Sequence, residues 1–143
     1  GQLSHAYLFF GGDKTTHKEK FAFADSLANF LEKGTFKESE GLLQDALVIS
    51  PDEKETIGID KIRILRYYLN TKPVISTRRL AIIERAENIT FEAQNAALKR
   101  VEEPPEAGLI IFSAGTNEDL LPTLVSRMQK IYFPSETRVN TDK

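Results

Sequence analysis

Two short stretches of the chain combine residue types that could bind a phosphate group and act on it. The first begins with the apolar run His5–Phe10, which continues into Gly11-Gly12 and then a helical pattern. A strand, a glycine turn and a helix form the layout of a phosphate-binding loop. The second is Glu84-Arg85, directly after the apolar run Leu80–Ile83. Ligands of open parallel sheets bind at the carboxyl ends of strands, so charges at this position are candidate site residues.

The glycine stretch departs from a working phosphate-binding loop. That loop reads GxxxxGK[ST], whereas this chain reads GGDKTTHKEK and has no second motif glycine. Lys14 and Lys18 lie nearby, but their spacing from the glycines differs from that of the motif lysine. We therefore favour a glycine turn leading into a packing helix over productive nucleotide binding. The start of that helix still has backbone N–H groups that could hold an anion.

Composition limits the class of protein. A chain of 143 residues predicts one domain, and 41% hydrophobic with 28% charged residues is typical of a soluble globular protein. The net charge of −2 gives no overall nucleic-acid signature, and the absence of cysteine excludes disulfides and thiolate zinc sites. The lack of cysteine fits a cytoplasmic protein, and no apolar run is long enough to span a bilayer. The start at Gly1-Gln2, without Met, suggests a trimmed tag or an excised fragment.

Strand and helix patterns alternate along the chain. We expect strands at His5–Phe10, Ala46–Ile49, Leu80–Ile83, Leu109–Phe112 and Lys130–Phe133. We expect helices at His17–Leu31, from the N-cap Asp60 to about Leu69, from the N-cap Thr90 to before Pro104, and around Asp119–Ser126. This alternation indicates an α/β domain with a parallel sheet.

Residues 82–105, IIERAENITFEAQNAALKRVEEPP, resemble a segment of bacterial clamp-loader subunits that reads IIDEAxxMTxEAxNALLKxLEEPP. These subunits, gamma/tau and delta-prime of DNA polymerase III, belong to the AAA+ family. The resemblance implies a RecA-like P-loop NTPase fold with a parallel five-stranded sheet in the order 5-1-4-3-2. It also implies a nucleotide-binding-type domain at residues 1–134 and a polar tail at 135–143, with the family's lid and collar domains absent.

The same resemblance implies that the ATP site is degenerate. Thr16 and His17 align with the family's loop lysine and Ser/Thr, and Ala114-Gly115 aligns with its polar sensor. Glu84-Arg85 replaces an Asp-Glu pair that supports magnesium and activates water, and arginine cannot act as a base. Glu84 could still approach a metal, although we favour a solvated strand end. We expect no bound cofactor here, and ATP to be held by partner subunits.

LLPTLVSRMQKIYF, residues 120–133, resembles the family's LLPTIxSRCQxxxF, with Met128 in place of the cysteine. In clamp loaders this Ser-Arg pair presents an arginine finger to ATP on the neighbouring subunit, which assigns that role to Ser126 and Arg127. The alternative is an arginine that interacts only with the dipole of its own helix. A retired local site beside a retained finger is the pattern of delta-prime, the stator of the clamp loader.

Three functions follow from these observations. We favour a non-hydrolysing stator domain whose partners are gamma/tau and delta, with the sliding clamp and primer-template DNA reached through the complex and no membrane contact. The alternatives are a divergent gamma/tau-like ATPase that uses Lys14 or Lys18 in a rearranged loop, and a repurposed AAA+ relative. We interpret His5 and His17 as structural residues, with no metal. Arg78-Arg79 and Lys99-Arg100 are interpreted as solvated charges rather than DNA contacts.

Overall fold

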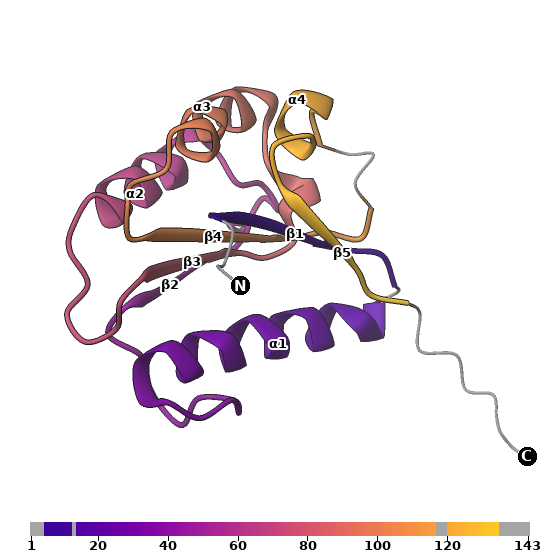
Figure 1. The fold of residues 1–143 in the computed structure, drawn as a ribbon. Helices are drawn as coiled ribbons and strands as arrows, with labels where there is room; N and C mark the ends of the chain where they lie inside the picture. The colour runs from indigo at the N-terminus through magenta and orange to yellow at the C-terminus, as the bar shows by residue number, and fades with distance from the viewer. Residues whose placement is uncertain (1–4, 13, 117–119, 135–143) are drawn as a thin grey trace, which may run out of the picture.

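A parallel sheet between two layers of helices forms the domain (Figure 1). The computed structural model describes residues 5–12, 14–116 and 120–134. The strands are β1 (Ala6–Phe10), β2 (Ala46–Ile49), β3 (Arg79–Ile83), β4 (Gly108–Ser113) and β5 (Gln129–Tyr132). They lie in the order β2-β3-β4-β1-β5, and every neighbouring pair is parallel. This is the predicted order 5-1-4-3-2 read from the other edge, so the fold prediction is confirmed.

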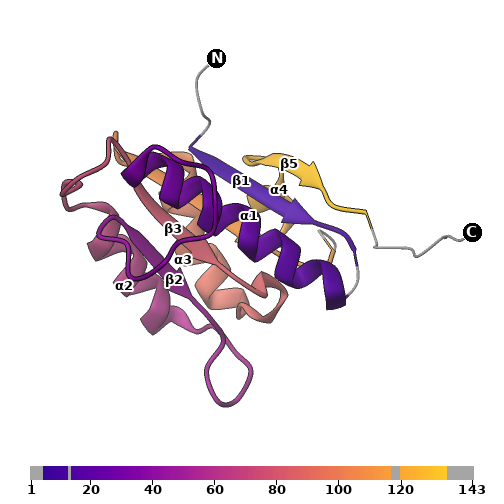
Figure 2. The ribbon, with the colours of Figure 1, turned by 90° about the horizontal axis from the view of Figure 1, so that it is seen from below.

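The helices divide between the two faces of the sheet. Helix α1 (Lys14–Lys33) crosses one face, as the view from below shows (Figure 2). Helices α2 (Ile59–Leu69), α3 (Phe91–Glu102) and α4 (Pro122–Val125) cover the opposite face, and the 3-10 turn η1 (Ala86–Asn88) precedes α3. Within the described ranges, no helix combines the length and the apolar character needed to cross a bilayer.

The central strands are buried on both faces because their apolar side chains alternate between the two helix layers. In β3, Leu80 and Ile82 pack with the α1 side, whereas Ala81 and Ile83 pack with the α2–α3 side. Ile82 pairs with Val48 of β2 and with Ile111 of β4, as the predicted neighbouring strands require. Strand β2 is an edge strand, however, and Val48 is 43% exposed.

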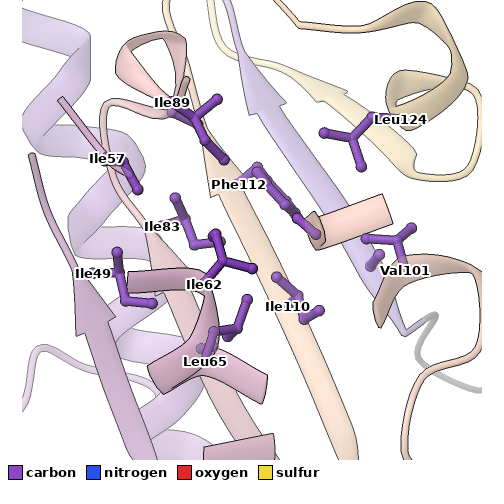
Figure 3. Close-up of a cluster of buried hydrophobic side chains, with 14 of the residues drawn as sticks. Ile49, Ile57, Ile62, Leu65, Ile83, Ile89, Val101, Ile110, Phe112 and Leu124 are labelled. Carbon is purple, nitrogen blue, oxygen red and sulfur yellow. The ribbon is translucent and has the colours of Figure 1, made fainter. Parts of the chain in front are cut away.

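The larger core cluster lies between the sheet and helices α2, α3 and α4 (Figure 3). Ile62 and Leu65 of α2 are almost fully buried, and Val101 of α3 is 7% exposed. They pack over Ile83 and Phe112 of the central strands. This core fixes α3 and α4 relative to the carboxyl ends of the strands, where the candidate site residues lie.

Helix boundaries differ from the predictions in three places. Helix α1 begins at Lys14 rather than His17, because the glycine turn is complete by Gly12. The N-cap of α2 is Gly58 and not Asp60, which lies inside the first turn. Helix α4 contains only four residues, Pro122–Val125, and the predicted start at Asp119 lies outside the described residues. The predicted cap of α3 is correct, since the Thr90 side chain accepts a hydrogen bond from the Ala93 N–H.

Candidate functional site

The carboxyl ends of β1, β3 and β4 bring the predicted nucleotide-site segments together. The Gly11 N–H donates to the Gly115 carbonyl over 3.0 Å, which joins the loop after β1 to the loop after β4. The Glu87 carboxylate follows β3 and accepts from the Gly115 N–H over 3.3 Å. A cavity of about 570 Å³ opens here, lined by Gly12, His17, Lys20, Glu55, Arg85, Glu87 and Gly115. Segments from three parts of the chain therefore meet around one cavity.

Both glycines of the first loop are required by the backbone. Gly11 and Gly12 have φ values of 93° and 80°, in the left-handed region that favours glycine. A Cβ atom on Gly11 would lie 2.5 Å from the Tyr132 ring, and one on Gly12 would lie 2.4 Å from Cβ of Thr16. The loop turns sharply against its own helix, and Thr16 is fully buried beneath it. The position aligned with the motif lysine therefore carries a packed threonine that cannot neutralise a phosphate.

Lys18 does not take the place of the motif lysine. Lys18 is exposed on α1 and does not line the cavity. The side chain of Lys14 lies outside the part of the chain that the structure describes.

Lys20 is the crevice residue that the sequence analysis missed. Its side chain is buried, and its Nζ donates to the carbonyls of Gly11 and Ala114 over 2.7 and 2.6 Å. Burial lowers the pKa of this ammonium group, and the nearby Glu87 carboxylate opposes that shift. The ammonium joins the carboxyl ends of β1 and β4 across the centre of the crevice. Its position four residues before Ala24, on the buried side of α1, is the sequence signal that could have identified it.

Glu84 and Arg85 both interact with other residues of the protein. The Glu84 carboxylate accepts a hydrogen bond from the Ser50 hydroxyl and lies 3.7 Å from Nε2 of His17. The Glu84 side chain is only 20% exposed, so it is more enclosed than the solvated strand end that we expected. Arg85 adopts a left-handed backbone with φ of 50°, and its Nη1 lies 3.5 Å from the Glu55 carboxylate.

The residues aligned with the sensor position, Ala114 and Gly115, carry no polar side chain. Ala114 is buried, and its carbonyl accepts from Lys20. Among the described residues, no group of three or more His, Cys, Asp or Glu side chains is placed to hold a metal ion. The charged groups at the crevice therefore interact with other groups of the same chain.

Ser126 and Arg127 lie outside this crevice, directly after α4. Ser126 is the C-cap of α4, and its hydroxyl donates to the Thr123 carbonyl over 3.1 Å. The Arg127 Nη1 donates to the same carbonyl over 2.7 Å, and its Nε lies 2.8 Å from the Glu102 carboxylate of α3. The Arg127 side chain is 41% exposed, so the guanidinium reaches solvent although it also forms a local ion pair. Met128 beside it is buried and anchors the segment.

The comparisons with known proteins agree with this architecture. Residues 1–137 match the family model described as DNA polymerase III, delta subunit. The DNA polymerase III subunit gamma/tau of Mycobacterium tuberculosis is 32% identical over 144 residues, which cover 93% of this chain and 25% of that protein. The subunit delta' of Bacillus subtilis is 30% identical over 142 residues, which cover 92% of this chain and 43% of that protein.

The chain belongs to the DNA polymerase III clamp-loader family. A solved structure supports the assignment: a gamma subunit-related protein of DNA polymerase III from Thermotoga maritima superposes with a TM-score of 0.76. It is 32% identical, and the match covers 98% of this chain and 42% of that protein. The chain thus spans less than half the length of these clamp-loader relatives. The resemblance in residues 82–105 and 120–133 is confirmed as a family relationship.

Proposed function

We propose that this domain is the non-hydrolysing stator domain of a DNA polymerase III clamp-loader subunit, similar to delta-prime. In this role it holds no ATP of its own and presents Arg127 to ATP in a neighbouring gamma/tau subunit. The partners are gamma/tau and delta, and the complex acts on the sliding clamp and primer-template DNA. The single observation that carries the proposal is the exposed guanidinium of Arg127, which lies outside the cavity of its own crevice.

The chemistry of arginine suits that role. A guanidinium is charged at every physiological pH, and its planar fork binds phosphate oxygens through two N–H groups. Arginine fingers in related phosphoryl transfers increase the rate by about 10³–10⁵. The state of the local crevice supports a role in trans, because Lys20, Glu84 and Arg85 interact with groups of the same chain.

The test is Arg127→Ala in the full-length subunit, reconstituted with its motor subunits, sliding clamp and primed DNA. We expect normal assembly, because an exposed ion pair contributes little to stability. DNA-stimulated ATP hydrolysis and clamp loading should both fall, by less than the full effect of one finger because the other sites keep theirs. Unchanged hydrolysis in a complex that assembles normally would refute the trans role.

The cavity of about 570 Å³ is the observation that favours a second candidate function. A divergent gamma/tau-like ATPase would need to bind magnesium-ATP in that cavity, and the stator would not. Isothermal calorimetry of the full-length subunit with magnesium-ATP separates the two. We expect no specific binding, because no described lysine occupies the position of the motif lysine. A micromolar dissociation constant would instead favour the ATPase.

A further inference from the structure

The Glu102–Arg127 ion pair joins the ends of two helices that are fixed in the core. Glu102 is the last residue of α3, and Arg127 is the second residue after α4. The Arg127 Nε lies 2.8 Å from Oε2 of Glu102, and the two side chains are 41% and 39% exposed. The pair therefore lies at the surface, while the backbones that carry it belong to packed elements.

Both helices are held in place beneath the pair. Val101, next to Glu102, is 7% exposed, and Leu124 of α4 is fully buried. The Gln94 side chain of α3 accepts a hydrogen bond from the Leu121 N–H over 2.6 Å, which ties α3 to the start of α4. Because α3 and α4 cannot shift easily against each other, the backbone positions of Glu102 and Arg127 are fixed relative to each other.

The hydrogen bonds of the guanidinium leave one part of its fork open. The Nε lies 2.8 Å from Oε2 of Glu102 in an ion pair, and Nη1 donates to the Thr123 carbonyl over 2.7 Å and to the Ser126 hydroxyl over 3.4 Å. Within the described residues, Nη2 makes no hydrogen bond. Arginine has five N–H donors in a fixed planar arrangement, so the Glu102 carboxylate beside Nε restricts the orientations that the whole guanidinium can adopt.

The position of Glu102 is not explained by the stability of its own helix. A carboxylate at the C-terminal end of a helix lies next to unpaired carbonyls and the negative end of the dipole. The adjacent Glu103 adds a second negative charge. An ion pair exposed to this extent also contributes little to folding. The remaining physical effect of the contact is to fix the direction of the Arg127 side chain.

We propose that Glu102 is the positioning residue for Arg127: its carboxylate pairs with the guanidinium at Nε, restricts the orientation of that side chain and leaves Nη2 available to the partner's nucleotide. This inference rests on the proposed trans role of Arg127. A catalytic group that is already held in its reactive orientation loses less entropy when the transition state forms. A shift of about 1 Å can lower a rate by about 10²-fold.

The experiment uses the complex reconstituted from full-length subunits and compares Glu102→Ala, Glu102→Gln and Arg127→Ala. The control is Glu103→Ala, which removes an equal charge from the neighbouring exposed position. We expect Glu102→Ala to lower kcat for DNA-stimulated ATP hydrolysis by a factor no larger than that of Arg127→Ala, while KM for ATP stays unchanged. Glu102→Gln should recover most of the rate, because its amide oxygen can occupy the position of Oε2 beside Nε. Glu103→Ala should match the wild type.

The double variant Glu102→Ala/Arg127→Ala identifies the route of the effect. If Glu102 acts through Arg127, the double variant is no slower than Arg127→Ala alone. If the Arg127→Ala complex is slow but the Glu102→Ala complex hydrolyses ATP at the wild-type rate or faster, the positioning role is overturned and the trans role remains intact. Additive losses, or a Glu102→Gln complex as slow as Glu102→Ala, would also overturn it. A wild-type rate for Arg127→Ala would refute the proposed function itself.

Discussion

Asp45 shows how one buried carboxylate can organise a loop. Its carboxylate accepts hydrogen bonds from the backbone N–H groups of Val74, Ile75 and Ser76, each over 2.7 Å, and its side chain is 1% exposed. Burial alone would raise the pKa of Asp45, but these donors and the nearby Arg79 outweigh it, so the pKa lies below the ordinary value. The chain that leads from α2 into β3 is therefore shaped around a permanent negative charge.

We predict that Asp45→Asn lowers the free energy of unfolding by about 3 kcal/mol near neutral pH, because the amide retains one acceptor oxygen and loses the charge. The lowered pKa means that the wild-type contribution is complete above 3.8 and is lost as the pH falls below that value. The difference between the two proteins should therefore shrink towards about pH 3 in urea unfolding. Asp60→Asn, which affects an exposed pair with Arg63, is the control and should change stability by less than about 1 kcal/mol. Equal effects at the two positions would contradict the prediction.

The residues of the candidate site were predictable to different degrees. Ser126 and Arg127 could be nominated because they lie in an intact local motif, and Gly11 and Gly12 because a turn between strand and helix requires them. The partners Lys20 and Glu102 were not found, since their roles depend on carbonyls and side chains far away in sequence. A lysine among helical apolar positions indicates burial, but the pattern does not name the acceptors.

Helix α3 carries core residues as well as Glu102. The capping of its first turn should therefore have a measurable effect on the stability of the domain. The Thr90 hydroxyl accepts from the Ala93 N–H over 3.1 Å. We predict that Thr90→Ala lowers the free energy of unfolding by about 1 kcal/mol, because one N–H of the first turn loses its acceptor. Urea unfolding measures the change, with Thr77→Ala in an exposed loop as the control. Indistinguishable midpoints for the two variants would show that the cap contributes nothing.

The elements differ in how well a sequence pattern defines their ends. Strands β2 and β3 were predicted within one residue, because a short apolar run is bounded by polar residues on both sides. The start of α2 was wrong because Asp60 suits either an N-cap or a first-turn acid, and Gly58 can cap without a side chain. The extent of α4 was overestimated because a helix of four residues is too short to show a period.

At the scale of the whole molecule, Lys20 links chain segments that are distant in sequence. We predict that Lys20→Met lowers the free energy of unfolding by about 2 kcal/mol, because the carbonyls of Gly11 and Ala114 lose their charged donor. The pKa of Lys20 is below its unfolded value of 10.5, so the unfolded chain holds this proton more tightly. Because of Lys20, the free energy of unfolding of the wild type should rise with pH up to about 10.5. The variant lacks this titrating group and should not show that increase.

Urea unfolding of both proteins at about pH 7 and about pH 10 measures this effect. Lys18→Met on the exposed side of the same helix is the matched control. The difference in the free energy of unfolding between wild type and Lys20→Met should widen as the pH rises. A difference that narrows would show that burial does not disfavour the charged form of Lys20.

The Lys20 ammonium also differs from a bound nucleotide or metal because its presence in the crevice does not depend on the concentration of a free ligand. It is covalently attached to the chain, so its local concentration near the ends of β1 and β4 does not depend on the medium. A ligand shifts a conformational equilibrium only through its different affinity for two states, and this cation cannot dissociate into the pool. Under the proposed stator role, a subunit built on this domain would keep the same crevice when cellular ATP rises or falls, while its motor neighbours respond. Energy supply would then reach the assembly through those neighbours alone.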